Sequence, residues 1–202
     1  MYFPKSSGFF FDSYCVLDLE TTGLRPASCE IIEIGILKIR QGKPVAKMDV
    51  LIKPRKLPIP AFITNLTGIS TEMVMEAPSI DEVSYWIYDF IQDGPILGYN
   101  VLFDLGFLKE HTRTHLPEPP FLDVLPLARI CYPELPRHSL SHMTAHLHLY
   151  QNTHRAIDDC AATYQLYELC KKKLEGKSAS QIQHEIDQFR QNRRPGRGSS
   201  NK

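Results

Sequence analysis

Short runs of apolar and β-branched residues predict three strands in the first quarter of the chain. The runs cover residues 14–20, 31–40 and 46–52, and Gly42 lies in the turn between the second run and the third. A tight turn of this kind joins antiparallel neighbours. We therefore expect the three strands to form an antiparallel meander.

The middle of the chain predicts helices and one further strand. A proline-rich connection over residues 54–70 precedes a helix at 79–91, where Trp86 is one of several apolar side chains at helical spacing. The stretch "PILGYN" (95–100) then predicts a short buried strand that leads into a helix at 104–111. A strand that leads into a helix is typical of an α/β fold.

The last third of the chain predicts mainly helices. Short helices are expected within residues 121–133 and 138–149, and the longest helix at 156–174. The inward stripe of the longest helix is expected to consist of Ile157, Cys160, Ala161, Tyr164, Tyr167 and Leu174.

Length and composition indicate one domain followed by a tail. With 202 residues, 43% of them apolar, the chain is long enough for one well-packed core and short for two. Residues 175–202 hold six basic and three acidic side chains and end in "RRPGRGSSNK". We expect a folded domain over residues 1–176 and a basic, flexible tail over residues 177–202.

Charge and cysteine content narrow the functional classes. Basic and acidic residues both number 23, so no global positive field attracts nucleic acid, and such a partner needs a local site. The five cysteines form no C-x-x-C pair, which fits a reducing compartment better than a disulfide framework. No apolar run reaches the roughly 18 residues of a membrane span. We expect a soluble cytoplasmic protein without a membrane partner.

Two carboxylates interrupt the first predicted strand, in the stretch "CVLDLETTGL" (15–24). Side chains alternate between the faces of a strand, so Asp18 and Glu20 point the same way and lie close together. Without a cation, this crowding raises the pKa of one carboxyl group. The alternative is a strand that ends near Leu19, with both acids in water. The glycine-containing turn "TTG" that follows favours a site.

Two later segments also carry acids where a helix begins. Asp104 lies at such a start, where an acid also serves as an N-cap or as a first-turn partner of the helix dipole. In "THRAIDDC" (153–160), His154 precedes the longest helix, and Asp158 and Asp159 lie in its first turns. Taken alone, that segment is equally a surface histidine with an acidic pair. The three acidic segments together favour one common site.

Three motifs resemble those of a known enzyme family. "VLDLETTGL" (16–24), "GYNVLFDLGFL" (98–108) and "HRAIDDC" (154–160) are similar, in order and separation, to the motifs of DEDDh-type 3′ to 5′ exonucleases. This ribonuclease-H-like family includes the proofreading subunit and domains of bacterial DNA polymerase III, and the likeness covers about residues 12–174. The second motif often has histidine where this chain has Tyr99, which bears on substrate contacts more than on chemistry.

The resemblance implies a ribonuclease-H-like α/β fold, with a mixed sheet flanked by helices, and a hydrolase that uses two divalent cations, Mg²⁺ or Mn²⁺. Such hard cations prefer oxygen ligands, in keeping with an acidic set that lacks cysteine. By resemblance, Asp18 bridges the two cations, Glu20 and Asp159 bind the cation that holds the attacking water, and Asp104 binds the other. His154, with a reference pKa of about 6.5, is the implied base for that water.

The resemblance also implies contacts with the substrate. Thr21, Thr22 and Gly23 would approach the terminal nucleotide, and Leu66 would wedge against its base. Asn100 and Phe103 would line the path of the strand. Apolar and stacking contacts of this kind tolerate any base sequence. The alternative is that Leu66 and Phe103 are ordinary core residues.

The implied function of the exonuclease domain (1–176) is the hydrolysis of single-stranded DNA 3′ ends to nucleoside 5′-monophosphates, with a DNA polymerase or another replication or repair protein as a partner. An RNA-trimming enzyme similar to oligoribonuclease or ribonuclease T would use the same residues. A non-catalytic module that recruits a polymerase or nucleic acid through the basic tail is a further alternative, which the complete acid set opposes.

A zinc site is the competing metal hypothesis. His138, His142 and His146 recur every four residues, a spacing that can place imidazoles on one helix face. Leu140, Met143 and Leu147 would form the opposite, apolar face. We therefore expect the three histidines to face solvent.

Overall fold

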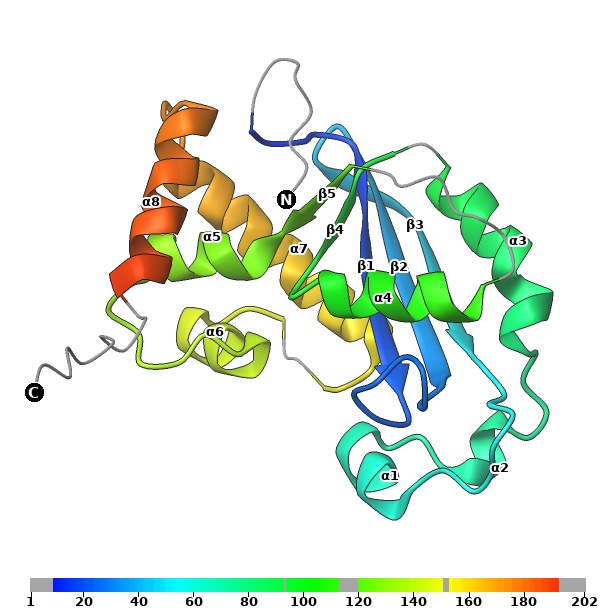
Figure 1. The fold of residues 1–202 in the computed structure, drawn as a ribbon. Coiled ribbons are helices and arrows are strands. Elements are labelled where there is room, and N and C mark those ends of the chain that lie inside the picture. The colour runs from blue at the N-terminus through cyan, green and yellow to red at the C-terminus, as the bar shows by residue number, and fades with distance from the viewer. Residues whose placement is uncertain (1–8, 93, 113–119, 151–152, 193–202) are drawn as a thin grey trace, which may run out of the picture.

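Five strands form one mixed sheet in the computed structural model, which describes residues 9–92, 94–112, 120–150 and 153–192 (Figure 1). The strands, in the order β3-β2-β1-β4-β5 across the sheet, are β1 (Tyr14–Thr21), β2 (Ile31–Arg40), β3 (Lys43–Leu51), β4 (Ile96–Gly98) and β5 (Phe121–Asp123). β1, β2 and β3 pair antiparallel, whereas β4 and β5 run parallel to β1. The α/β class and the antiparallel meander are confirmed.

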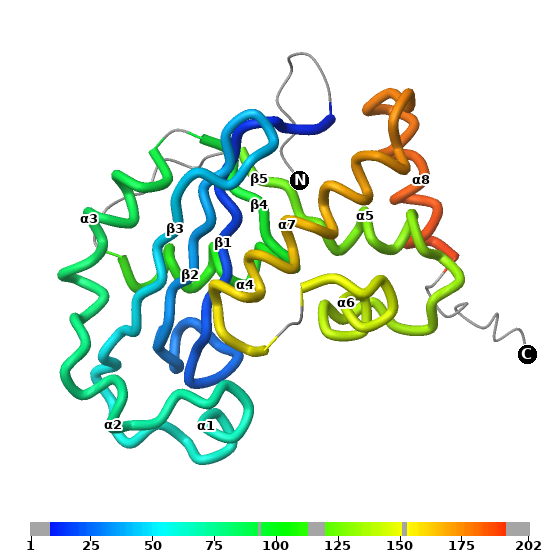
Figure 2. Tube along the Cα trace, turned by 180° about the vertical axis from the view of Figure 1, so that it is seen from behind, coloured from blue at the N-terminus to red at the C-terminus, as the bar shows by residue number. Residues whose placement is uncertain are grey.

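Helices cover both faces of the sheet. α3 (Ile80–Ile91) and α4 (Leu102–His111) lie on one face, and α7 (Ala156–Lys173) crosses the other, as the two opposite views show (Figures 1 and 2). α5 (Val124–Cys131), α6 (Leu140–Leu147) and α8 (Ala179–Asn192) gather beside α7. No helix in these described ranges combines the length and the apolar character that a membrane crossing requires.

Successive side chains of β1 pack alternately into two separate hydrophobic cores. Leu17 and Leu19 pack with residues of α3 and α4, whereas Tyr14 and Val16 pack with α5, α7 and α8. Because side chains alternate, Asp18 lies on the same face of β1 as Val16, which is the face that α7 covers. The sheet therefore directs this acid toward α7 and not into the core under α3 and α4.

Two expectations about individual elements were wrong, and one large apolar side chain of α3 is exposed. The connection over residues 54–70 contains helix α1 (Ala61–Thr67), followed by α2 (Thr71–Val74), and both pack on a small core around Ile32. β5 occupies the start of the segment 121–133, which was expected to be one helix. Trp86 is 56% exposed on the outer side of α3. Local spacing does not reveal these outcomes because each depends on what the segment packs against.

The inward stripe of α7 is shifted from the predicted one. Cys160, Tyr167 and Leu174 are buried as expected, but Ile157, Ala161 and Tyr164 are only half-buried at its edges. Their places in the core are taken by Ala156, Asp159, Ala162, Thr163, Leu166 and Cys170. A polar residue, Asp159, thus lies on the buried side of the helix.

The expectation of a flexible tail from residue 177 is wrong for residues 179–192, which form α8. Ile182 and Ile186, four residues apart on one face of α8, are 0% and 1% exposed in the core that α5 and α7 share. Phe189 packs edge-on against His138 at a ring-centroid distance of 6.0 Å. Residues 193–202, which include "RRPGRGSSNK", lie outside the described residues.

We predict that α8 contributes to the stability of the whole domain. Ile186→Ala should lower the free energy of unfolding by about 2–5 kcal/mol, because it leaves a cavity in a closed core. Gln191→Ala, on the exposed side of the same helix, should change it by less than about 0.5 kcal/mol. Urea unfolding followed by circular dichroism measures both values. Equal stability of the two variants would mean that α8 does not hold this core together.

Candidate active site

Three segments far apart in the sequence meet at one end of the sheet. The carboxyl end of β1, the start of α4 and the start of α7 lie together there, with α1 nearby (Figure 1). β4 runs parallel to β1, so both strands end at the same edge of the sheet. Because α4 follows β4, it begins at this edge. This arrangement gathers the acids of all three sequence motifs.

Glu20, His154 and Asp159 form the one cluster with metal-binding potential in the described ranges. One ligand atom from each of the three lies within 4.8 Å of the others. Asp104 is 3% exposed, and its Oδ1 accepts a hydrogen bond of 3.1 Å from the Leu19 backbone N–H. This bond joins the start of α4 to β1 directly beside Asp18.

The electrostatics of the site are those of crowded acids. Burial, and then the charges of Asp104 and Asp159, raise the pKa of Asp18 well above its usual value. Burial, with Asp159 and Glu33 as further causes, raises the pKa of Glu20 to about 8. The pKa of Asp159 rises to about 7, mainly through burial and also through the charge of Asp158. Near neutral pH, such a cluster stays partly protonated unless cations compensate its charge.

Asp104 is held differently from the other acids. Burial raises its pKa well above the usual range, but the hydrogen bond from the Leu19 N–H opposes this shift. A backbone donor stabilises the charged carboxylate and also fixes its orientation. One oxygen of Asp104 is therefore committed to β1.

His154 and the two adjacent aspartates take different positions at the start of α7. His154 has a left-handed backbone (φ 57°), which turns the chain just before the helix. Asp158 is half-buried, and its Oδ2 accepts a hydrogen bond of 2.6 Å from the Thr153 hydroxyl. Asp159 is 5% exposed and lies in the cluster with Glu20. The structure thus separates the two acids, and Asp159 is the one beside the other carboxylates.

The turn after β1 is built from the predicted threonines and glycine. The Thr21 hydroxyl donates to the Gly23 carbonyl at 2.7 Å, and the Thr22 hydroxyl accepts from the Glu30 N–H at 2.9 Å. A Cβ at Gly23 would lie 2.7 Å from the Cys29 sulfur, so a side chain there would require the Cys29 side chain to move. The turn is thereby held closely against its own return segment.

The remaining predicted substrate residues differ in exposure. Leu66 is 52% exposed on α1, so the alternative of an ordinary core residue is wrong for it. Phe103 is half-buried and packs against Phe107 with ring centroids 5.0 Å apart, which makes it part of the core edge. Asn100 is exposed and has a left-handed backbone (φ 65°).

Sequence reasoning missed two acids that support the site. The carboxylate of Asp123, at the end of β5, accepts hydrogen bonds from the Asn100 N–H at 2.8 Å and from the Leu125 N–H at 3.0 Å. Glu33 on β2 is fully buried and binds Arg155 at the start of α7. A charged residue inside the apolar run "IIEIG" (31–35) was the sequence signal for Glu33. Nothing local distinguishes Asp123 from an ordinary helix cap.

The zinc hypothesis is not supported by the described residues. His138 precedes α6 and is buried, with its Nε2 2.9 Å from the Tyr132 carbonyl oxygen, so the expectation that it faces solvent was wrong. His142 is half-buried and His146 exposed. Among the described residues, these histidines form no metal-binding group.

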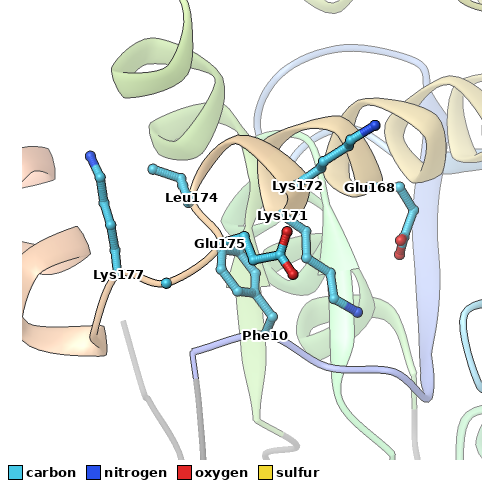
Figure 3. Close-up of a pocket in the computed structure, with 8 residues that line it drawn as sticks. Phe10, Glu168, Lys171, Lys172, Leu174, Glu175 and Lys177 are labelled. Carbon is cyan, nitrogen blue, oxygen red and sulfur yellow. The ribbon is translucent and has the colours of Figure 1, made fainter.

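A hollow of about 370 Å³ lies beside the far end of α7. Phe10, Glu168, Lys171, Lys172, Leu174, Glu175, Gly176 and Lys177 line it (Figure 3). The amino groups of Lys172 and Lys177 point in different directions (Figure 3), and Lys171 forms an ion pair with Asp12. The positive charges therefore do not converge on one ligand.

The raised pKa values predict how the stability of the metal-free protein depends on pH. A carboxyl group whose pKa is raised by folding favours the folded state at low pH, and this contribution is lost as the pH rises through the folded value. With folded pKa values of about 8 for Glu20 and about 7 for Asp159, the melting temperature in EDTA should fall between pH 6 and pH 8.5. For a domain of this size, about 1 kcal/mol corresponds to about 2–4 °C.

Calorimetry or thermal-shift measurement in EDTA checks this dependence. The Glu20→Gln variant should show a smaller fall, because one of the two groups no longer titrates. Saturating Mn²⁺ should remove most of the fall in the wild-type protein, since bound cations compensate the carboxylates. A melting temperature that rises over this pH range, or equal falls in both proteins, would contradict the assignment.

Comparison with known proteins identifies the family of this chain. Residues 15–167 match the model of the exonuclease family. Among curated relatives, the PolC-type DNA polymerase III of Clostridium perfringens is 37% identical over 82% of this chain, and the 3′-5′ exonuclease DinG of Staphylococcus saprophyticus is 37% identical over 80%. The matches span 12% and 18% of the lengths of these two relatives.

Two solved structures of exonucleases have the same fold as this chain. Exonuclease X, in complex with 5′-overhanging duplex DNA, superposes with a TM-score of 0.65 at 25% identity and covers 86% of this chain and 99% of its own. Escherichia coli exonuclease I, bound to single-stranded DNA, has the same fold, with a TM-score of 0.69 at 20% identity over 86% of this chain and 42% of its own. The chain therefore belongs to the exonuclease family, with the ribonuclease-H-like fold that its three motifs predict.

Proposed function

We propose that this chain is a metal-dependent 3′ to 5′ exonuclease that hydrolyses single-stranded DNA ends and releases nucleoside 5′-monophosphates. Membership of the exonuclease family and the similarity to PolC-type polymerases and to DinG support the direction and the substrate. The observation that carries the proposal is the convergence of Glu20, His154 and Asp159 beside Asp18 and Asp104. Several carboxylates this close together repel one another, and bound cations would compensate their charge. The histidine adds a group that can accept a proton.

The proposed metal ligands are Asp18, Glu20, Asp104 and Asp159. Their oxygen atoms suit two Mg²⁺ or Mn²⁺ ions. The raised pKa values of the cluster agree with this, because they reflect negative charges that bound cations would compensate. Two such cations, when bound, stabilise the charge on the phosphate and on the attacking and leaving oxygens. The asymmetry of Asp104, with one oxygen held by the Leu19 N–H, fits a role on one cation only.

His154 is the proposed general base. Its imidazole lies next to Glu20 and Asp159 at the open side of the cluster, half-buried, where a water molecule can reach it. A neutral imidazole has one ring nitrogen that can accept a proton, so His154 can take the proton of the attacking water. Because of its left-handed backbone, His154 belongs to the turn before α7 and not to the helix itself.

The proposed path of the DNA strand passes the turn after β1, the end of α1 and the start of α4. Thr21, Thr22 and Gly23 supply a rigid turn for the terminal nucleotide, and exposed Leu66 supplies an apolar surface for its base. Asn100 and Phe103 continue the path, and Asp123 holds the backbone of Asn100. None of these contacts depends on base identity, as a general exonuclease requires.

A 5′-labelled single-stranded oligonucleotide tests the proposal. We expect stepwise shortening with Mg²⁺ or Mn²⁺, nucleoside 5′-monophosphates as the product, and no activity in EDTA. A covalently closed single-stranded circle should survive, because it offers no 3′ end. Cleavage of the circle, or undiminished activity in chelator, would contradict the proposal.

Two further substrates define the specificity. The RNA oligonucleotide of the same sequence should be cut more slowly than DNA; faster cleavage of RNA would identify an RNA-trimming enzyme instead. A duplex with a mispaired 3′ end should be shortened faster than a fully paired one, because the mispaired end frays into a single strand. Such a preference, together with the PolC-type relatives, would support a proofreading role beside a DNA polymerase, which is the proposed setting.

A further inference from the structure

Glu33 uses both of its carboxylate oxygens on the start of α7. Oε1 accepts hydrogen bonds from Nε and Nη2 of Arg155, at 2.8 and 2.5 Å, and Oε2 accepts one of 2.8 Å from the Ala156 backbone N–H. The Glu33 side chain is 0% exposed, whereas that of Arg155 is 36% exposed. A fully buried carboxylate on β2 is thus paired with a residue 122 positions later in the chain.

These contacts replace a missing helix cap. α7 has Arg155 at its N-cap, and arginine has no acceptor for the unpaired amides of a helix start. Glu33 supplies that acceptor from the neighbouring strand and also places negative charge at the positive end of the helix dipole. The first turn of α7, which carries Asp159, is therefore capped by the sheet and not by its own sequence.

α7 packs unusually closely against the same part of β2. A Cβ at Gly35 would lie 2.4 Å from the carbonyl carbon of Ala156, so only glycine allows this approach. The Cys160 thiol donates to the carbonyl oxygens of Gly35 and Val16 at 3.2 and 3.4 Å. Glu33, Gly35 and Cys160 thus seat the first turns of α7 on β1 and β2.

The segment held in this way lies between two proposed site residues. Arg155 directly follows His154, and its carbonyl accepts the backbone N–H of Asp159 at 3.0 Å. Any displacement of Arg155 and Ala156 would move His154 on one side and Asp159 on the other. The left-handed backbone of His154 is uncommon for a non-glycine residue, so contacts from the neighbouring segment help to hold it.

Glu33 is not suited to be a fifth metal ligand. It lies directly opposite Glu20 in the register of β1 and β2, so it adds negative charge next to the site. Both of its oxygens, however, are engaged by Arg155 and Ala156, and the guanidinium compensates its charge.

We infer that Glu33 and Arg155 form a positioning pair that holds His154 and Asp159 in the geometry needed for catalysis. The kinetic part of this inference rests on the proposed function, whereas the structural part does not. The pair acts through α7 and makes no contact with substrate. Its loss should therefore lower the turnover and the metal affinity while leaving the affinity for DNA largely intact.

Glu33→Gln and Arg155→Met test the pair, and Glu168→Gln is the matched control. Glu168 lies on the same helix and accepts a hydrogen bond of 2.9 Å from the Tyr14 hydroxyl, far from the site. Glu33→Gln should lower kcat at least about tenfold and weaken Mn²⁺ binding, measured by calorimetry, by about tenfold or more. The KM for the oligonucleotide should change by less than about threefold. The control should match the wild-type protein in all three quantities.

Two more variants establish that the residues act together. The double variant Glu33→Gln/Arg155→Met should lose no more than the worse single variant, because both changes remove the same contact. Arg155→Lys keeps the positive charge and should retain more activity than Arg155→Met. Arg155→Lys keeps a cation beside the buried Glu33 carboxylate, so this variant remains informative if Glu33→Gln does not fold.

Hydrogen–deuterium exchange in EDTA provides a readout that is independent of nuclease activity. Glu33→Gln should speed the exchange of amides in residues 153–160, and Glu168→Gln should leave these amides unchanged. If the wild-type protein cuts no nucleic acid, the proposed function fails, while exchange and Mn²⁺ affinity still decide on the pair. A folded Glu33→Gln protein with wild-type exchange and wild-type Mn²⁺ affinity would overturn the inference.

Discussion

Asp18→Asn is expected to abolish nuclease activity without destabilising the metal-free protein. The acid lies at the centre of the cluster, where Asp104, Asp159 and Glu20 all raise its pKa. As the proposed shared ligand of two cations, Asp18 should contribute several kcal/mol of transition-state stabilisation, so its replacement should lower kcat by about 10³-fold or more. One member of a repulsive group also disappears, and the melting temperature in EDTA at pH 8 should stay equal or rise.

Single-turnover hydrolysis and thermal unfolding of the same preparations measure both effects. Asp89→Asn, an exposed acid on α3, is the matched control and should behave as the wild-type protein. Mn²⁺ should raise the melting temperature of the control but not that of Asp18→Asn, because the variant has lost a ligand. Near-normal turnover in purified Asp18→Asn protein would eliminate the two-metal assignment.

Asp159→Asn and Asp158→Asn are expected to have opposite outcomes although the residues are adjacent. Asp159 is buried within the cluster of Glu20 and His154, so its replacement should lower kcat by about 10²-fold or more and weaken Mn²⁺ binding. Asp158 accepts a hydrogen bond from the Thr153 hydroxyl. Asparagine keeps an oxygen for that bond, and the variant should retain most of its activity and Mn²⁺ affinity.

The comparison of these two variants controls for charge and position, because each loses one negative charge at the start of α7. Calorimetry with Mn²⁺ and initial rates on a single-stranded oligonucleotide measure the difference. If the two variants exchanged phenotypes, Asp158 and not Asp159 would be the ligand, and the alignment of the third motif would be wrong by one residue.

Much of the fold could be predicted from local pattern. β1 and β2 were expected within one residue of their observed ends, because the chain there combines β-branched residues with a clear turn. The start of α7 at Ala156 was expected as well. The family was predicted from three motifs, and the match over residues 15–167 confirms it. These features depend on neighbours in the sequence, which local patterns describe well.

The elements that could not be predicted depend on distant partners. β5 is three residues long and exists because it pairs with β4, whereas its sequence continues directly into α5. α8 lies beyond the family match and has a polar composition, yet Ile182 and Ile186 bury it in the core. α8 has only three large apolar side chains, which are a weak signal in a sequence, although in a packed core they decide where the helix lies.

The sequence by itself determined which chemistry is available: four acids and one histidine, in three motifs with a recognisable order. Only the tertiary structure decided which acids lie close together and which have their negative charge compensated by another side chain. Glu33 and Asp159 are both buried acids near the start of α7, but Arg155 pairs with Glu33, whereas Asp159 lies in a cluster of acids. The difference is physical, because the ionisation of a buried carboxylate depends on the charges and donors within a few ångströms of it. In this fold those groups come from segments more than one hundred residues apart.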